Sequence, residues 1–480
     1  MTRKLLTDVS ASTFQVIMNQ VLGIAVFLIT SLYLPKDVYG ELNWSYAVLM
    51  FVVTILSLRL EQIVVRRAAV DQDTSGIMTL FMVHVLLSGL GFYLLLLVLS
   101  FIFPAFFTLH SFLLALGISQ LLTFFALPFK NVANGKEKFI YLAVMSSTAN
   151  LIRTVSLCII IAFSELTIQW VLGIFIATSF IELMVSFYLV TNRMQVKLSA
   201  HIRFSDYVLL LKESLPQIGV AVLMAGISRM DWILLGFFST AAITAEYSFA
   251  YRVYELSPLP LLIIAPVLLS RFSRYFAANT EQSLLQQKER LSLLVRGEMI
   301  LASIVPLILN IIWAPFIDSL TGNKYGAVNQ QTFLILSCCI PFQYISNIIW
   351  SANFAQNRLK LILRITLVTF CIILIGDLIF IPLYNVTGAA LVYLSAMIVE
   401  YINYMRSSSL SKIRDTWQSL IICMIAAGST GLGAFYLFDD VALRLLFAIP
   451  VFSFLLLATR QLRINDIGYI LRSIKKKKPG

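Results

Sequence analysis

The stretch from Ile77 to Phe103 reads IMTLFMVHVLLSGLGFYLLLLVLSFIF and contains no Asp, Glu, Lys or Arg. A transmembrane helix needs roughly 20 apolar residues in a row to cross the hydrocarbon core of a bilayer. This stretch is long enough, and similar apolar runs, separated by short polar breaks, recur along the whole chain. The pattern predicts an all-α polytopic membrane protein.

The composition of the whole chain agrees with this interpretation. Of its 480 residues, 59% are hydrophobic and only 12% are charged, and the mean hydropathy is +0.88. Soluble globular proteins carry about 25% charged residues. The longest polar-looking segment, 191–213, is far shorter than a typical domain of about 100 residues. We therefore expect no ATPase or soluble catalytic domain, no cofactor and no bound metal.

We predict fourteen transmembrane spans, separated by breaks at polar or turn-forming residues. The spans are 12–34, 39–65, 77–103, 106–131, 138–163, 167–190, 214–238, 242–270, 290–316, 328–354, 361–382, 386–409, 416–437 and 441–460. An even number of spans places both termini on the same side of the membrane.

The distribution of Lys and Arg predicts which side of the membrane each segment faces. With a cytoplasmic N-terminus, 29 of the 36 Lys and Arg residues lie in inner segments or near the inner ends of spans, three lie in outer loops and four lie in the interior of spans. Cytoplasmic loops of membrane proteins carry such an excess of positive charge. We therefore expect both termini in the cytoplasm, and we attribute the net charge of +12 to this asymmetry rather than to nucleic-acid binding.

Two short stretches at the start of the second and eighth spans are similar. Residues 39–46 read YGELNWSY, and residues 244–251, at an offset of 205, read TAEYSFAY. Internal repeats are common in membrane transporters. The repeat predicts a six-helix half over residues 1–205, a second six-helix half over 206–410, and two additional helices with a basic tail over 411–480.

Three motifs resemble those of a known family. Residues 33–42 (YLPKDVYGEL) and 58–67 (LRLEQIVVRR) are similar to the first hairpin of the Wzx-type polysaccharide-export flippases. Residues 379–390 (IFIPLYNVTGAA) look like the turn between the eleventh and twelfth helices of that family. These flippases belong to the multidrug/oligosaccharidyl-lipid/polysaccharide exporter superfamily, and the resemblance extends over residues 5–460.

The resemblance implies an alternating-access transporter, and not an enzyme, in the bacterial cytoplasmic membrane. Its cargo would be an isoprenoid-pyrophosphate-linked oligosaccharide, moved from the inner to the outer leaflet for assembly of O-antigen, capsule or a similar polymer. Membrane lipids and a polysaccharide polymerase would be its partners. The alternative is a related exporter of lipid II or of cationic drugs. A third hypothesis, a membrane polymerase or ligase, is disfavoured because all outer loops are short.

Charged residues within the spans are the candidate site residues. A charge at the bilayer centre costs at least ~3 kcal/mol, so it is expected to face a partner or an aqueous cavity. A pyrophosphate diester carries about two negative charges, and Arg binds phosphate oxygens with two parallel hydrogen bonds. We therefore predict that the four arginines within spans bind the substrate: Arg59, Arg153, Arg229 and Arg252.

Each of these arginines also has a structural alternative. Arg153 could pair with Glu182 of the next span, and Arg59 could extend its side chain to the inner surface. Arg252 lies three residues before Glu255, a spacing that favours an ion pair on one helix face. Arg229 lies two residues before Asp231 and cannot pair well with it. Arg229 and Asp231 could instead join Arg252 and Glu255 in one network.

Carboxylates within the spans are candidates for ion coupling. A proton-coupled transporter needs a carboxylate that binds and releases a proton near neutral pH, and burial can provide this. The candidates are Asp231, Glu255, Glu298 and Glu400. Glu298 and Glu400 have no obvious partner close in sequence, and pairing with a distant arginine is the alternative for both.

Overall fold

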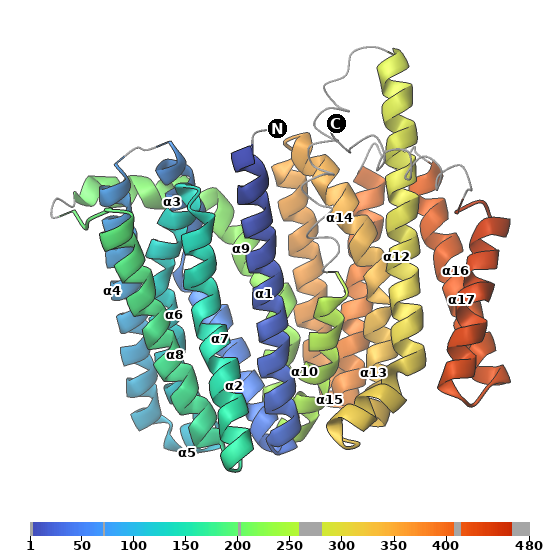
Figure 1. Ribbon diagram of the computed structural model, residues 1–480, viewed down its shortest axis with the longest axis horizontal. Helices are drawn as coiled ribbons and strands as arrows, with labels where there is room; N and C mark the ends of the chain where they lie inside the picture. The colour runs from blue at the N-terminus through green and yellow to red at the C-terminus, as the bar shows by residue number, and fades with distance from the viewer. Residues whose placement is uncertain (1–2, 71–72, 200–202, 259–280, 408–413, 463–480) are drawn as a thin grey trace. The chain divides into compact units, whose positions relative to one another are not determined.

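The structure, a computed structural model, describes residues 3–70, 73–199, 203–258, 281–407 and 414–462 (Figure 1). Within these residues, helix is the only regular secondary structure, and eleven helices are long and apolar enough to cross a membrane. The chain is therefore an all-α polytopic membrane protein, as the sequence predicts. The total of fourteen spans and the cytoplasmic position of the termini stay predictions.

The chain divides into two compact units, Met1–Ala245 and Glu246–Gly480. The helices of the first unit are α1 (Arg3–Tyr33), α2 (Lys36–Leu56), α3 (Leu60–Ala69), α4 (Thr74–Ile102), α5 (Pro104–Leu109), α6 (Phe112–Gly135), α7 (Phe139–Phe163), α8 (Ile168–Tyr188), the π-helix η1 (Leu189–Arg193), α9 (Phe204–Phe238) and the start of α10 (Ala241–Leu256). The second unit continues with α12 (Glu281–Thr321), α13 (Gly326–Ser337), α14 (Cys339–Ala355), α15 (Leu359–Ser407), α16 (Arg414–Leu437) and α17 (Val441–Ala458). The predicted domain boundaries at 205 and 410 stay a prediction.

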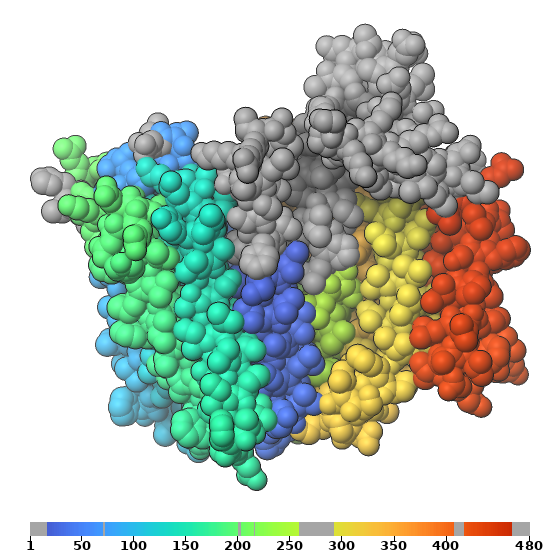
Figure 2. Space-filling view, viewed as in Figure 1, coloured from blue at the N-terminus to red at the C-terminus, as the bar shows by residue number. Residues whose placement is uncertain are grey.

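The core of the first unit lies where α6 packs against α3, α4 and α8. Phe81, Phe124 and Phe129 are among its fully buried side chains. By contrast, α7 and α8 pack side by side and both reach the surface shown in Figure 2. The two helices expose apolar side chains, such as Ile159 and Phe180. Exposed apolar faces are expected where a helix meets lipid rather than water.

The polar breaks in the sequence mark helix ends as predicted. The carboxylate of Asp73 accepts a hydrogen bond from the Gly76 amide (3.0 Å) at the start of α4, and Asp440 does the same for Leu443 (3.0 Å) at the start of α17. Such N-caps satisfy backbone amides that have no partner within the helix. Gly322, with φ +59, follows the last residue of α12, where the left-handed conformation favours glycine.

The predicted second span, 39–65, is not one continuous helix. It breaks between α2 and α3, where Leu58 and Arg59 both adopt the left-handed conformation (φ 48 and 59). The break leaves the Leu56 carbonyl without its helical partner, and the His84 Nε2 on α4 lies 2.8 Å from that oxygen. Because a carbonyl only accepts, Nε2 carries the proton, and Nδ1 accepts from the Tyr207 hydroxyl at 2.8 Å. A contact between elements distant in sequence therefore stabilises the break.

Replacing His84 should destabilise the fold. His84→Leu removes the donor to the partly buried Leu56 carbonyl, and leaving a buried polar group without a partner costs about 1–3 kcal/mol. Tyr207→Phe removes only the second hydrogen bond, so we expect a smaller loss of about 1 kcal/mol. Thermal unfolding of the two purified variants in detergent measures both losses of stability. Equal melting temperatures for His84→Leu and the wild type would contradict this role.

The eleventh and twelfth predicted spans correspond to the two halves of α15. Asn385 (φ 49, ψ −128) forms a kink between them, close to the predicted turn. A Cβ at Gly388 would lie 2.3 Å from the Phe380 carbonyl oxygen, so the close approach of the two halves requires glycine there. Of the predicted eighth span, 242–270, the structure describes α10, and residues 259–270 lie outside the described residues.

Candidate functional site

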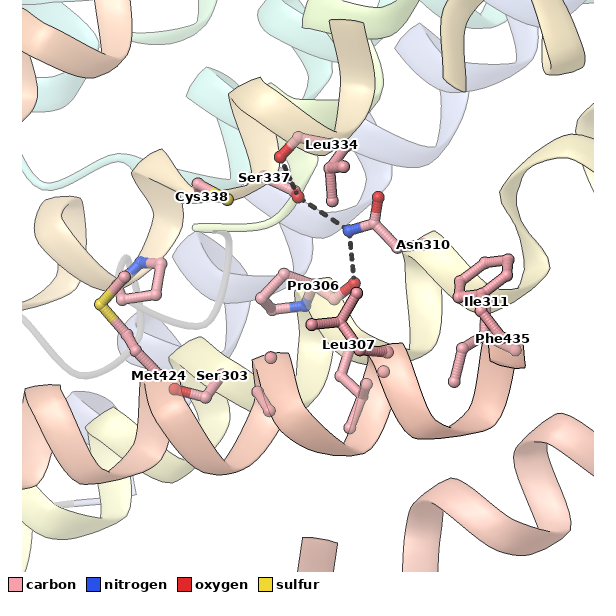
Figure 3. A pocket seen from close by; sticks show the side chains of 15 residues that line it. Ser303, Pro306, Leu307, Asn310, Ile311, Leu334, Ser337, Cys338, Met424 and Phe435 are labelled. Atoms are coloured by element: carbon pink, nitrogen blue, oxygen red, sulfur yellow. Dashed lines mark hydrogen bonds between the residues drawn. The ribbon is translucent and has the colours of Figure 1, made fainter. Parts of the chain in front are cut away.

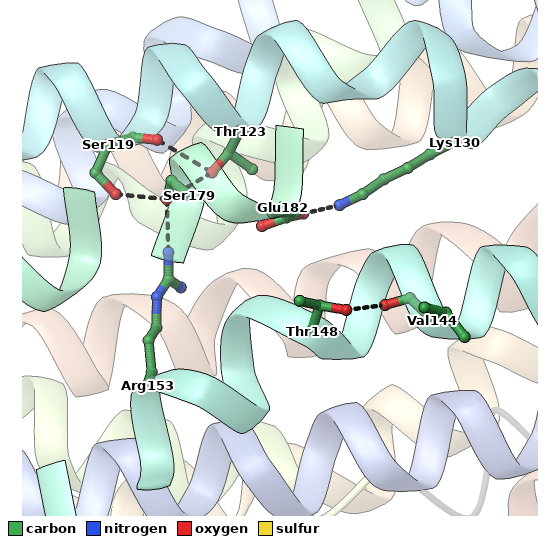
Figure 4. Close-up of polar contacts among 8 residues, drawn as sticks. All are labelled: Ser119, Thr123, Lys130, Val144, Thr148, Arg153, Ser179 and Glu182. Atoms are coloured by element: carbon green, nitrogen blue, oxygen red, sulfur yellow. Dashed lines mark hydrogen bonds and ion pairs between the residues drawn. The ribbon is translucent and has the colours of Figure 1, made fainter. Parts of the chain in front are cut away.

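Arg153 is anchored inside the first unit by neutral groups of α8 (Figure 4). Its Nε donates to the Thr178 hydroxyl (2.9 Å) and its Nη2 donates to the Ser179 hydroxyl (2.8 Å). The guanidinium carbon also lies 4.7 Å from the centre of the Phe175 ring, a distance typical of a cation–π contact. None of these three partners carries a negative charge, so they orient the guanidinium without neutralising it.

The two hydroxyls that hold Arg153 belong to a larger buried cluster. Ser179 is fully buried, and its hydroxyl lies 2.9 Å from that of Ser119 and 3.2 Å from that of Thr123, both on α6. The Ser119 hydroxyl also donates a hydrogen bond to the Phe175 carbonyl oxygen (3.1 Å). The small side chains let α6 and α8 approach closely, as is common between membrane helices. The cluster fixes the position of Ser179 and, through it, of Arg153.

Glu182 does not form the ion pair with Arg153 that was one alternative for this residue. Its carboxylate pairs instead with the Lys130 ammonium on α6 (Figure 4). Glu182 is 4% exposed, and a carboxylate so deeply buried requires a partner. The charge distribution counts Lys130 with the inner segments, at the end of the predicted span 106–131, but its side chain is only 16% exposed, so it belongs to the interior cluster.

Arg59 is the last residue of the break between α2 and α3 and directly precedes α3. Its backbone amide lies 3.4 Å from the Ser57 hydroxyl, and its side chain is half-buried. The Glu61 carboxylate interacts electrostatically with Arg59 and hydrogen-bonds Ser57. The break therefore presents Arg59 on a tight turn instead of on the face of a regular helix.

Arg229 and Asp231 both lie on α9, and each contacts a different part of Trp232. Arg229 Nη1 lies 3.3 Å from the Ser228 carbonyl, and its guanidinium carbon lies 5.0 Å from the Trp232 ring. Asp231 is fully buried, and its Oδ1 accepts from the Trp232 amide at 2.8 Å. The side chain of Trp232 thus packs against Arg229, while its backbone satisfies Asp231.

In the second unit, Arg252 and Glu255 form the ion pair that their spacing favours. Arg252 Nη1 lies 2.9 Å from Glu255 Oε2, with 40% and 24% of the two side chains exposed. Exposed or half-exposed pairs of this kind contribute little stability. The ion pair partly neutralises the charges of Arg252 and Glu255. The wider network with Arg229 and Asp231 stays a prediction.

Glu298 and Glu400 have different environments in the second unit. Glu298 on α12 is 2% exposed, and neither carboxylate oxygen has a hydrogen-bond partner among the described residues. Tyr344 on α14 is near enough to interact with it electrostatically. Glu400 in the second half of α15 hydrogen-bonds Thr369 in the first half. Of these two carboxylates, Glu298 is therefore the one that its described surroundings leave unsatisfied.

An apolar cavity of about 270 Å³ lies between α12, α13 and α16 in the second unit (Figure 3). Two of its polar side chains, Asn310 and Ser337, are hydrogen-bonded to each other. Asn310 Nδ2 donates to the Pro306 carbonyl (2.8 Å) and the Ser337 hydroxyl (2.7 Å), and Ser337 donates to the Leu334 carbonyl (2.8 Å). The cavity therefore offers an apolar surface within the membrane, and α16 supplies one of its walls.

The sequence did not single out Lys130, Thr178 or Ser179 as site residues. Serine and threonine within a span carry no distinctive signal, because their hydroxyls can also bond to carbonyls of their own helix. Thr178 does so with the Ile174 carbonyl at 2.7 Å. Only the packing of α6 against α8 brings Lys130 to Glu182, and no sequence spacing predicts that contact.

Comparisons with known proteins identify the family and the fold. The family model described as polysaccharide biosynthesis protein matches residues 5–276, more than half of the chain. No curated protein matches the sequence significantly.

Among solved structures, the lipid II flippase MurJ in an inward closed conformation is similar, with a TM-score of 0.70 and 16% identity over 92% of this chain and 97% of that chain. An inward-facing multidrug resistance MATE transporter of the MOP superfamily has a TM-score of 0.59 and 13% identity over 82% and 96%. The MATE transporter VcmN of Vibrio cholerae has a TM-score of 0.54 and 15% identity over 86% and 100%.

At these identities the solved structures establish a shared fold. The family follows from the model match, which includes the first unit with α6, α7 and α8. Two of the three motifs that resemble polysaccharide-export flippases, 33–42 and 58–67, lie within the matched residues, and the third, 379–390, lies outside them. This chain belongs to the polysaccharide biosynthesis protein family and has the fold of the MOP-superfamily transporters.

Proposed function

We propose that this protein is a flippase for isoprenoid-pyrophosphate-linked oligosaccharides in the bacterial cytoplasmic membrane. It moves these units from the inner to the outer leaflet by alternating access, for assembly of O-antigen, capsule or a similar surface polysaccharide. A polysaccharide polymerase in the same membrane then uses the cargo. The family match and the shared fold of flippases and multidrug transporters support this class of function.

The environment of Arg153 is the observation that favours an anionic cargo. The guanidinium is held by two hydroxyls and an aromatic ring, and its Nη1 takes no part in these hydrogen bonds. A cation that is oriented but not neutralised attracts phosphate oxygens and repels a cationic drug. Arg59, beside Glu61 at the break before α3, is a second candidate for contact with the pyrophosphate.

Ion coupling is a further part of the proposal. Glu298 is the best-placed coupling carboxylate, because it is buried and no described residue hydrogen-bonds it. Asp231, Glu255 and Glu400 each have at least one hydrogen-bond partner, so their carboxylates are already stabilised. Glu298→Gln should therefore lower ion-driven transport more than Glu400→Gln does.

A cargo panel in proteoliposomes tests the proposed function. Fluorescent pyrophosphate-linked oligosaccharide, lipid II and a cationic dye are offered separately, and transfer between leaflets or uptake is measured. We expect transfer of the oligosaccharide lipid well above that in protein-free liposomes, and no uptake of the dye. Dye uptake without transfer of the anionic lipid would contradict the proposal and favour a multidrug exporter.

Lipid II is the second candidate cargo, because MurJ, described as a lipid II flippase, shares the fold over nearly the whole chain. Lipid II also carries a pyrophosphate-linked saccharide, so the arginines would serve it equally well. Faster transfer of lipid II than of the oligosaccharide lipid would select this alternative.

A further inference from the structure

Three charged side chains from three helices meet inside the first unit. Lys130 lies near the end of α6, Arg153 lies in the middle of α7, and Glu182 lies on α8 (Figure 4). With Lys130 and Arg153 positive and Glu182 negative, the cluster carries one net positive charge. The single carboxylate can neutralise only one of the two cations, and the structure shows it paired with Lys130.

Glu182 lies within electrostatic range of Arg153. It lies three residues after Ser179 and four after Thr178, so all three share one face of α8. These two hydroxyls hold the guanidinium of Arg153, and Arg153 interacts electrostatically with Glu182. Arg153 therefore lies about one helical turn from a buried carboxylate and still hydrogen-bonds neutral hydroxyls instead.

We propose that Lys130 is a positioning residue that keeps Glu182 away from Arg153, so that the guanidinium retains an uncompensated positive charge for the cargo. Lys130 need not touch the cargo itself. This inference rests on the proposed function, because it supposes that Arg153 binds an anionic group. It assigns a role in substrate recognition to an ion pair that would otherwise only link α6 to α8.

The consequence of losing Lys130 follows from the cost of an unpaired buried charge. A buried carboxylate that loses its partner is strongly destabilised, so it takes up the nearest available cation. In Lys130→Met, that cation is Arg153. The guanidinium then exchanges its hydroxyl partners for a carboxylate, and the net charge of the cluster falls from one to zero. Affinity for an anionic cargo should fall with it.

The test is a set of matched variants in the proteoliposome assay with the pyrophosphate-linked oligosaccharide. We expect Lys130→Met to slow transfer about tenfold or more, because a charge-assisted contact with the phosphate is lost. Adding Glu182→Gln to Lys130→Met removes the competing carboxylate and should bring the rate back to within about threefold of the wild type. Lys130→Arg, which keeps the pair, should also stay within about threefold.

The rescue separates this role from a purely structural one. If the ion pair only stabilised the packing of α6 on α8, the double variant would transport no better than Lys130→Met, and that result would overturn the inference. Glu182→Gln alone provides a second test, independent of whether Lys130→Met accumulates. It raises the net charge of the cluster, so we expect transfer to be retained, and a tenfold loss would also overturn the inference.

The outcomes also distinguish this inference from the proposed function. If the wild-type protein transfers no pyrophosphate-linked lipid, the proposed function is wrong and the role of Lys130 falls with it. If the wild type transfers the lipid but Lys130→Met is unaffected, or its loss is not rescued, the role of Lys130 is wrong and the proposed function stands. Melting temperatures of all variants show whether a loss of transfer follows from a loss of folding.

Discussion

Arg153→Ala should reduce transfer of the pyrophosphate-linked lipid by about 10- to 100-fold, because hydrogen bonds to a charged group contribute about 1.5–3 kcal/mol and 1.4 kcal/mol corresponds to a factor of ten. The variant removes the one cation of this cluster that is bound only by neutral groups, the hydroxyls of Thr178 and Ser179 and the ring of Phe175. Initial rates of leaflet transfer in proteoliposomes measure the effect.

Two further variants sharpen this prediction. Arg153→Lys keeps the charge but loses the planar fork that binds phosphate with two hydrogen bonds, so its rate should lie between those of Arg153→Ala and the wild type. Arg444 is a matched control, since it also contacts an aromatic ring, Phe435 at 4.3 Å, and a carbonyl, Phe438 at 2.8 Å. Arg444→Ala should transfer cargo normally. A normal rate in Arg153→Ala would exclude this arginine from cargo binding.

Gly40→Val should strongly destabilise the first unit. A Cβ at Gly40 would lie 1.8 Å from the Ala241 carbonyl oxygen and 2.6 Å from its carbon. Both are backbone atoms, so no side chain can rotate away to make room. Overpacking typically costs 1–3 kcal/mol and more where the backbone must shift, so we expect a loss above about 3 kcal/mol.

The same contact fixes the neighbouring side chains. Trp44, one turn along α2 from Gly40, donates from its Nε1 to the Ile233 carbonyl at 3.0 Å. Its indole occupies the space that a Cβ at Gly236 would enter. Separating α2 from α9 and the start of α10 would break this hydrogen bond and expose the indole surface, which adds to the cost of Gly40→Val.

The matched control for Gly40→Val is Gly91→Val on α4. A Cβ at Gly91 meets no atom within 4 Å, so the same substitution has room, and we expect it to leave the melting temperature nearly unchanged. Thermal unfolding in detergent and the yield of monodisperse protein measure both variants. Similar melting temperatures for Gly40→Val and Gly91→Val would show that α2 and α10 are not closely packed.

The sequence predicted the fold class well because apolar length and polar breaks are local signals. An apolar run such as 77–103 and the helix ends at Asp73 and Gly322 are set by neighbouring residues and by the membrane, and not by contacts with distant helices. The break between α2 and α3 was missed because residues 57–59 contain neither Gly nor Pro. It is stabilised by His84 from another helix, and a pattern of hydropathy cannot reveal such a contact.

The candidate site shows the same division between local and distant contacts. The ion pair between Arg252 and Glu255 was predictable because three residues separate them on one helix. The environment of Arg153 was not, since it depends on which helices surround α7. The sequence offered Glu182 as one possible partner of Arg153. Because α6 packs against α8, Glu182 pairs with Lys130 instead.

The most direct test of the central claim is the voltage dependence of cargo transfer. Labelled pyrophosphate-linked oligosaccharide lipid is placed in the inner leaflet of proteoliposomes, and its appearance in the outer leaflet is followed with and without an inside-negative potential. A cargo with two negative charges gains ~4 to 5 kcal/mol per 100 mV, so we predict outward transfer that the potential accelerates. No transfer above that of protein-free liposomes, or uptake of a cationic dye in its place, would contradict the assignment of this protein as a flippase for anionic lipid-linked saccharides.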